Sequence, residues 1–321
     1  MTESSLDAEL NLATTAAKAR ATGKAAASVL YDAPGPRARR LTWVGSVVAG
    51  VLIALAAWLF VYRPLAAQDQ FTMELWGPFI DPDNPNFEAL WRRLGVGVLA
   101  TLKAAALAIV ASLVLGVAIA ILRLQLKHLI TRRYAHLPVP LAWGVRGLSW
   151  ALNALTRVCV DVLRGMPVVI TIFFAARALP ELGVRLDDVM WYLVVGLTAY
   201  NMIVIAEIIR SGMEGLPRGQ REAAASLGLS PAQTTTLVLL PQAVRIMLPA
   251  LISQLVVVLK DTSLGFIISY NELLNIGKLA VLRLHNPLQM YFVIGLIYLG
   301  FNYALSRMAD WTQRRLARGR A

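Results

Sequence analysis

Five ionisable side chains lie inside the long apolar runs of this sequence: Lys103, Glu207, Arg210, Lys260 and Asp261. A charge in hydrocarbon is costly unless it has a partner, a wet cavity or a shallow position. Cationic groups next to hydroxyl and amide groups are suited to binding a carboxylate. One hypothesis is a polar path through the membrane, formed by Lys103, Arg164, Asn201, Glu207, Lys260, Asp261, Thr262 and Ser263.

A second hypothesis assigns the same charges a purely structural role. Glu207 and Arg210 are three residues apart, so they share a helix face and can pair. Asp161 and Arg164 have the same spacing. The charges would then lock helices together, or would pair across two subunits.

A loop at residues 215–241 is the other segment whose residue types suggest a role. Pro217 is placed to start a short helix, and Gly228 is placed to end it with a left-handed cap. Ser230 and Gln233 are spaced as a capping box for a following helix, with Pro231 at its first position. Pro241 is expected to break that second helix.

The short helix predicted in this loop has the surface of a docking element. The run Ala223–Ala225 is small and flat, which lets another protein's backbone approach closely. Arg218, Arg221 and Glu222 are placed to set the register of such a contact. The alternative is an ordinary surface helix within a long loop.

The elements that position these residues are predicted to be membrane helices. The chain of 321 residues is 57% hydrophobic and only 16% charged, with a mean hydropathy of +0.60, which excludes an ordinary soluble domain. The formal charge of +12 fits the basic bias of cytoplasmic membrane loops better than nucleic-acid binding. A single cysteine, Cys159, allows no internal disulfide, and no second metal-ligating residue lies at ligand spacing from it.

Six apolar runs are long enough to cross a bilayer as helices. They lie near residues 41–62, 94–122, 159–179, 189–210, 243–265 and 288–306. The third is interrupted near its start by Asp161, Arg164 and Pro167. Lysine and arginine are concentrated in both terminal tails and in the loops 123–157 and 211–232, which places these segments, and both termini, in the cytoplasm.

The loop resembles the EAA loop of bacterial binding-protein-dependent ABC importer permeases. Glu222-Ala223-Ala224, Gly228 and Val238-Leu239-Leu240-Pro241 have that family's spacing, with Val238 in place of the usual isoleucine. The resemblance implies that the helix docks on a separate ATPase and passes its closing motion to the membrane helices. The residues implied in this coupling are Arg218, Gln220, Glu222, Ala223, Ala224, Gly228, Leu240 and Pro241.

Other segments resemble the polar amino-acid branch of these permeases. They are Leu163–Pro167, with Met166 where that branch has threonine, Ala206–Gly212 and Leu259–Leu264. Leu30–Pro36, Trp76–Phe79 and Thr101–Ala105 resemble the glutamate-uptake permeases of actinobacteria. The resemblance runs from residue 29 onward, and it favours glutamate, with aspartate and glutamine as related possibilities.

The resemblance implies a multi-pass subunit of the bacterial cell membrane that supplies half of a translocation path. Its implied partners are an ABC ATPase dimer, an extracytoplasmic amino-acid-binding protein and a second permease subunit, a related chain rather than a copy of itself. No nucleic acid is expected as a partner. ATP and magnesium are expected to be used by the ATPase, and this chain is expected to bind no cofactor or metal.

Several kinds of enzyme site are absent from the sequence. The glycines before Lys24 and Lys278 lack the upstream glycine of a phosphate loop, so no ATP site is predicted. The histidines, His128, His136 and His285, are scattered. The alternative function is a secondary transporter driven by an ion gradient, which would predict an internal repeat, and no convincing repeat is visible.

The predicted fold class is all-α: a five-helix importer core with one extra N-terminal transmembrane helix. The expected segments are a disordered tail at 1–40, the extra helix at 41–62, an external loop at 63–93, the permease domain at 94–312 with its coupling loop at 215–241, and a basic tail at 313–321.

Overall fold

A computed structural model describes residues 35–131 and 138–318. Contacts divide the chain into two units, residues 1–71 and 72–321, and each is considered by itself. Most of the predicted tail at 1–40 lies outside the described residues.

The first unit is one long apolar helical run. It comprises α2 (Pro36–Ala57), a π-helical turn η1 (Trp58–Tyr62) and α3 (Arg63–Ala67). The segment Arg39–Ala67 is long and apolar enough to cross a membrane, and no residue of its most apolar window is buried within the chain. The predicted extra helix is therefore present, and lipid is the solvent that suits its exposed apolar surface.

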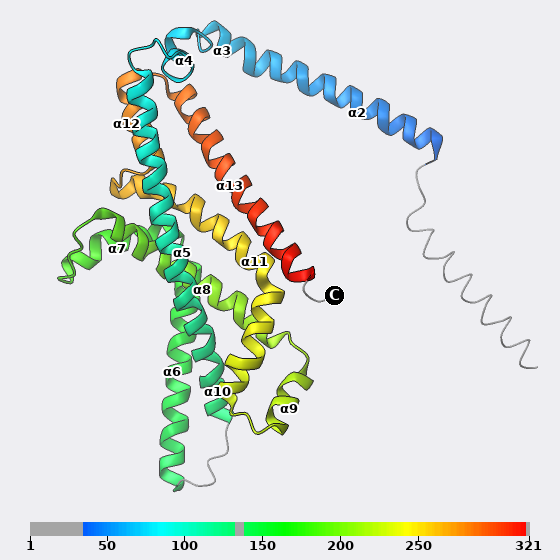
Figure 1. Ribbon diagram of the computed structural model, residues 1–321, viewed down its shortest axis with the longest axis vertical. Helices are drawn as coiled ribbons and strands as arrows, with labels where there is room; N and C mark the ends of the chain where they lie inside the picture. Colours follow the sequence, from blue (N-terminus) through cyan, green and yellow to red (C-terminus); the bar gives the residue numbers. More distant parts are fainter. Residues whose placement is uncertain (1–34, 132–137, 319–321) are drawn as a thin grey trace, which may run out of the picture. The chain divides into compact units, whose positions relative to one another are not determined.

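The second unit is built of helices, and its described residues contain no β-strand (Figure 1). Its elements are α4 (Met73–Ile80), α5 (Phe87–Thr131), α6 (Val139–Gly165), α7 (Val168–Glu181), α8 (Val189–Glu214), α9 (Arg218–Ser226), α10 (Pro231–Gln233), the π-helical η2 (Thr234–Leu239), α11 (Leu240–Asp261), the 3₁₀-helical η3 (Thr262–Ile268), α12 (Leu273–Leu284) and α13 (Pro287–Arg318). The helix α5 packs along α8, α6 and α12, and α11 packs on α8 and α13. Figure 1 shows α9 and α12 toward opposite ends of this unit.

Within residues 35–131 and 138–318, five helical runs qualify as membrane spans, and a bent helix pair supplies a sixth. The third predicted span, 159–179, is wrong as a single helix, because α6 and α7 meet at a bend of 108°. Met166 is extended, with φ −86° and ψ 140°, and Pro167 follows it. A residue before proline is driven out of the helical region by the proline ring, which explains the break.

The predicted cytoplasmic loop at 123–157 is mostly helical in the structure. The helix α5 continues to Thr131, and α6 begins at Val139. The predicted external loop at 63–93 likewise contains α3 and α4 and the start of α5. Hydropathy did not predict these extensions, because it detects only the part of a helix that lies in hydrocarbon.

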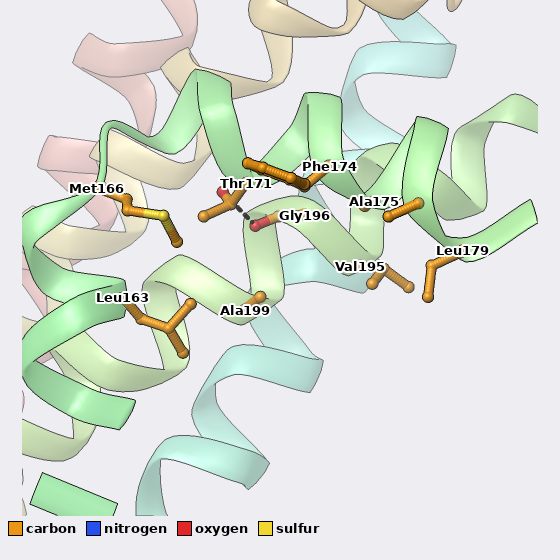
Figure 2. A pocket seen from close by; sticks show the side chains of 10 residues that line it. Leu163, Met166, Thr171, Phe174, Ala175, Leu179, Val195, Gly196 and Ala199 are labelled. Atoms are coloured by element: carbon orange, nitrogen blue, oxygen red, sulfur yellow. Dashed lines mark hydrogen bonds between the residues drawn. The ribbon is translucent and has the colours of Figure 1, made fainter. Parts of the chain in front are cut away.

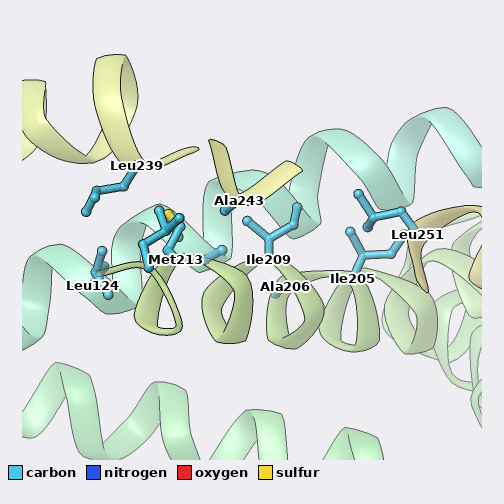
Figure 3. Close-up of a cluster of buried hydrophobic side chains, with 10 residues drawn as sticks. Leu124, Ile205, Ala206, Ile209, Met213, Leu239, Ala243 and Leu251 are labelled. Carbon is cyan, nitrogen blue, oxygen red and sulfur yellow. The ribbon is translucent and has the colours of Figure 1, made fainter. Parts of the chain in front are cut away.

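The hydrophobic core near α9 joins three helices (Figure 3). Leu124 of α5, Ile205, Ile209 and Met213 of α8 and Ala243 of α11 are all buried there. These side chains hold the ends of α5, α8 and α11 together where the chain leads into and out of α9.

A buried acid organises the opposite end of the unit. The side chain of Glu272 has 0% exposure and caps α12 by accepting the N–H groups of Leu274 and Asn275, each at 2.7 Å. The Tyr298 hydroxyl of α13 donates to the same carboxylate at 3.2 Å. Burial raises the pKa of Glu272 to about 7, although these three hydrogen bonds favour the ionised form.

Stability is therefore expected to depend on pH through Glu272. Its pKa is about 7 in the fold against an ordinary 4.5, so folding favours the protonated form. The contribution of Glu272 to stability should be complete below about pH 4.5 and should fall by roughly 3 kcal/mol as the pH rises to 7. The Glu272→Gln protein should lose most of this dependence in thermal unfolding of the detergent-solubilised chain between pH 5 and 8. Glu74→Gln, at an exposed glutamate, should retain it, and identical pH profiles for both variants would refute the assignment.

Candidate functional site

The predicted docking helix is α9, and its ends are formed as its sequence indicated. Pro217 immediately precedes the helix, and Gly228 follows it with φ +75°. The N–H of Leu229 donates to the Ala224 carbonyl at 3.1 Å, and the N–H of Gly228 donates to the Ala225 carbonyl at 2.9 Å. This pair of bonds is a Schellman cap, which requires a left-handed residue where glycine stands.

The segment after α9 begins with the predicted capping box. The Ser230 N–H donates to Gln233 Oε1 at 2.9 Å, and the Gln233 N–H donates to Ser230 Oγ at 3.3 Å. Pro241, however, does not end this helix, because Pro231–Ile268 forms one continuous helical run. The prediction of a break was wrong. The π-helical turn η2 changes the hydrogen-bond register just before Pro241. Pro241 therefore falls in the first turn of α11, where its missing N–H is tolerated.

Half of the residues predicted to couple are exposed on α9 itself, and most of the others follow the helix. Ala224 alone among them is buried, at 3% exposure, and it packs toward the body of the protein. Leu240 is half-buried. The exposed members of the set are Arg218, Gln220, Glu222, Ala223, Gly228 and Pro241.

Two side-chain contacts attach α9 to the membrane helices. The Arg221 guanidinium donates to the Met213 carbonyl near the end of α8, at 3.1 Å. Gln242 of α11 donates from Nε2 to Gln220 Oε1 at 3.2 Å. A force on α9 would thus reach both α8 and α11 directly.

An ionic cluster joins α5 to α8 close to this end. Glu207 accepts from Arg210 Nε at 3.0 Å and from Arg123 Nη1 at 3.1 Å. Glu214 binds Arg210 and also Lys127, the latter at 3.1 Å. The predicted pairing of Glu207 with Arg210 is confirmed. Two arginines engage the Glu207 carboxylate, which supports the helix-locking interpretation for this residue.

Sequence reasoning missed three members of the ionic cluster. Glu214 is four residues after Arg210, a spacing that indicates a helical ion pair. Arg123 and Lys127 belong to a different helix, and Arg123 is 84 positions from its partner Glu207. No local pattern reports such a contact.

The other residues of the predicted polar path are spread over α5, α6, α8 and the junction of α11 with η3. Asn201 is fully buried, and its side-chain amide bonds the Leu197 carbonyl and Gln254. Thr262 is also fully buried and donates to the Leu259 carbonyl. The remaining members are exposed or half-buried, and no ion pair joins any of them across 35–131 and 138–318; they are Lys103, Arg164, Lys260, Asp261 and Ser263. Their role in a path stays a prediction.

An apolar pocket of about 400 Å³ lies where α6, α7 and α8 meet (Figure 2). Leu163, Phe174 and Val195 are among its walls. The Thr171 hydroxyl crosses from α7 to the Gly196 carbonyl of α8 at 3.0 Å. Such a lining suits a lipid chain or a neighbouring helix better than a charged solute.

The long apolar helices and the short exposed helix α9 between two of them define the class: a multi-pass membrane protein with a small helix exposed between two spans. Residues 137–318 match the family described as "Binding-protein-dependent transport system inner membrane component". The match covers more than half of the chain, and the chain belongs to this family. The family predicted from the loop residues is thereby confirmed.

Relatives and solved structures agree with this assignment. The chain is 36% identical to the glutamate transport system permease protein GluD of Corynebacterium glutamicum over 259 residues, 80% of this chain and 85% of the relative. It is also 36% identical to the "Probable glutamine ABC transporter permease protein GlnP" of Bacillus subtilis over 184 residues, 56% of this chain and 78% of the relative. A solved amino acid ABC transporter shares the fold with a TM-score of 0.58 at 22% identity, covering 74% of this chain and all of that one.

Proposed function

We propose that this permease subunit forms half of the translocation path of an ATP-driven importer for a polar amino acid, with glutamate the foremost solute. The observation that carries the proposal is the exposed face of α9, a helix that starts after Pro217, ends at the Gly228 cap and is bonded to α8 and α11. The similarity to GluD over most of both chains supports glutamate. The remaining partners are an extracytoplasmic amino-acid-binding protein and a second, related permease subunit.

The contacts of α9 explain how ATPase closure would move the membrane helices. A displacement of α9 acts on the Met213 carbonyl at the end of α8 and on Gln242 near the start of α11. These helix ends share a packed core with α5, and Glu207 binds Arg123 of α5. Close-packed interiors transmit strain rather than absorb it, so the three helices respond together.

The energy for transport is proposed to come from a separate subunit. The chain has no phosphate loop, and we assign ATP and Mg²⁺ to the ATPase dimer. The groove on that ATPase would receive the small Ala223 side and the charged Arg218 and Glu222 of α9.

The test is reconstitution with the ATPase, the binding protein and the second permease in proteoliposomes. We expect uptake of labelled glutamate that requires ATP on the α9 side and the binding protein on the other side. Competition by aspartate, glutamine and asparagine would rank the solutes. Uptake that survives without ATP and collapses with an ionophore would instead establish the secondary transporter.

A further inference from the structure

A second cavity, of about 250 Å³, lies between the later part of α7, the start of α8 and the end of η3. Its lining residues are Phe173, Ala176, Arg177, Val189, Tyr192, Ile267, Ile268 and Ser269. None of them belongs to the predicted polar path or to α9. Liquid water occupies about 30 Å³ per molecule, so the space equals roughly eight waters and can admit a small metabolite.

Three side chains at this cavity, those of Arg177, Tyr192 and Ser269, can donate hydrogen bonds into it. Arg177 lies over the ring of Phe173, 5.8 Å from its centroid, and no carboxylate lies within 4 Å of its guanidinium in the described parts of the chain. The Tyr192 oxygen already accepts the Leu186 N–H at 2.8 Å, so its own hydrogen is free to be donated. Ser269 adds a hydroxyl at the same wall.

The backbone presents Ser269 in an uncommon conformation. Its φ of 62° is left-handed, which few residues other than glycine adopt. The 3₁₀ helix η3 ends there, and the Ser269 N–H bonds the Phe266 carbonyl at 3.1 Å. Conformations of this kind persist where the surroundings hold them, and they are frequent at binding sites.

The donor set specifies the chemistry of the ligand. A guanidinium forms two parallel hydrogen bonds with a carboxylate, and hydroxyl hydrogens complete the shell of such an anion. No aspartate or glutamate lines the cavity to oppose it. The remaining walls are apolar and suit a short methylene chain.

The position of the cavity along α8 relates it to transport. Val189 and Tyr192 begin α8, whose other end leads through Gly215 into α9. A helix of 26 residues is about 39 Å long, which exceeds the roughly 30 Å of bilayer hydrocarbon. The cavity and the docking helix are therefore separated by a whole membrane span.

We propose that this cavity is an entry subsite that binds a carboxylate of the amino acid released at the face opposite α9, with Arg177 as the main ligand and Tyr192 and Ser269 as supporting donors. This inference rests on the proposed function, because the carboxylate bound in the cavity belongs to the amino acid that the proposed importer transports.

Protection of a cysteine placed in the cavity tests the proposal directly. The single cysteine, Cys159, is first replaced by alanine, and Ser269→Cys is introduced in the complex in nanodiscs. Glutamate at millimolar concentration should slow labelling by a methanethiosulfonate reagent at least threefold, whereas sodium chloride of equal ionic strength should not. Arg177→Gln should abolish this protection, and Arg185→Gln, an exposed arginine of the α7–α8 loop, should preserve it.

Uptake kinetics separate the possible outcomes. Arg177→Gln removes a charge-assisted hydrogen bond to the solute, so it should raise the KM for uptake on the order of tenfold, against less than twofold for Arg185→Gln. Labelling unaffected by glutamate, or protection that survives Arg177→Gln, overturns the subsite. Weaker attachment of the binding protein without any protection by glutamate also overturns it, and assigns Arg177 to protein docking. A wild-type complex that transports no amino acid overturns the proposed function instead, whatever the labelling shows.

Discussion

Replacing Glu222 with lysine is expected to uncouple ATP hydrolysis from uptake while leaving the permease folded and inserted. Glu222 is exposed on α9, and its side chain makes no hydrogen bond or ion pair within the described residues. The Ser226 hydroxyl donates to its backbone carbonyl, which the substitution leaves in place. Stability should therefore be nearly unchanged. If α9 docks on the ATPase, the lysine would repel the basic group that Glu222 faces there. A loss of about 2 kcal/mol or more in docking free energy would lower coupled uptake roughly 30-fold. Uptake and ATPase activity of the same proteoliposomes measure this separation.

Two further variants make the result interpretable. Glu74→Lys makes the same charge change at an exposed glutamate of α4 and should leave uptake within about twofold. Gly228→Val should reproduce the uncoupling, because valine resists the φ of +75° that the cap of α9 requires. Full coupling in both Glu222→Lys and Gly228→Val would show that α9 does not transmit the ATPase motion.

The Gly196→Ala variant is expected to loosen the contact between α7 and α8. A Cβ at Gly196 would lie 2.4 Å from the Ile172 Cα and 2.9 Å from the Ile172 nitrogen. These are backbone atoms, so no side-chain rotation relieves the clash, and α7 must move away. Overpacking of this kind costs about 1–3 kcal/mol and outweighs the roughly 1 kcal/mol that alanine gains over glycine in a helix. The Thr171 bond to the Gly196 carbonyl should weaken as well.

Thermal unfolding in detergent and uptake in proteoliposomes measure this effect. The matched control is Gly95→Ala in α5, where an added Cβ meets nothing within 4 Å. That variant should be as stable as the parent or slightly more so. If Gly196→Ala equalled Gly95→Ala in unfolding temperature, the close approach of α7 to α8 would not contribute to stability.

Much of the fold was predictable because the bilayer imposes a strong composition on the helices that cross it. The apolar runs near 41–62, 94–122, 189–210, 243–265 and 288–306 each fall within a helix of the structure. The bounds of α9 and the start of α10 were predictable for a different reason. Pro217 and Gly228 act through their own backbones, and the Ser230–Gln233 box acts over one helical turn. Local chemistry of this kind depends on few neighbours.

The sequence by itself thus determined the class of protein, its membrane helices and the short helix α9, because hydropathy, helix-terminating residues and a motif at fixed spacing act locally along the chain. Only the tertiary structure decided that the helix continues through Pro241, that Arg123 binds Glu207, and that Arg177, Tyr192 and Ser269 share a cavity. Those contacts depend on which faces of the helices pack against one another. Packing between segments far apart in the chain determines these faces, and no local sequence pattern predicts them.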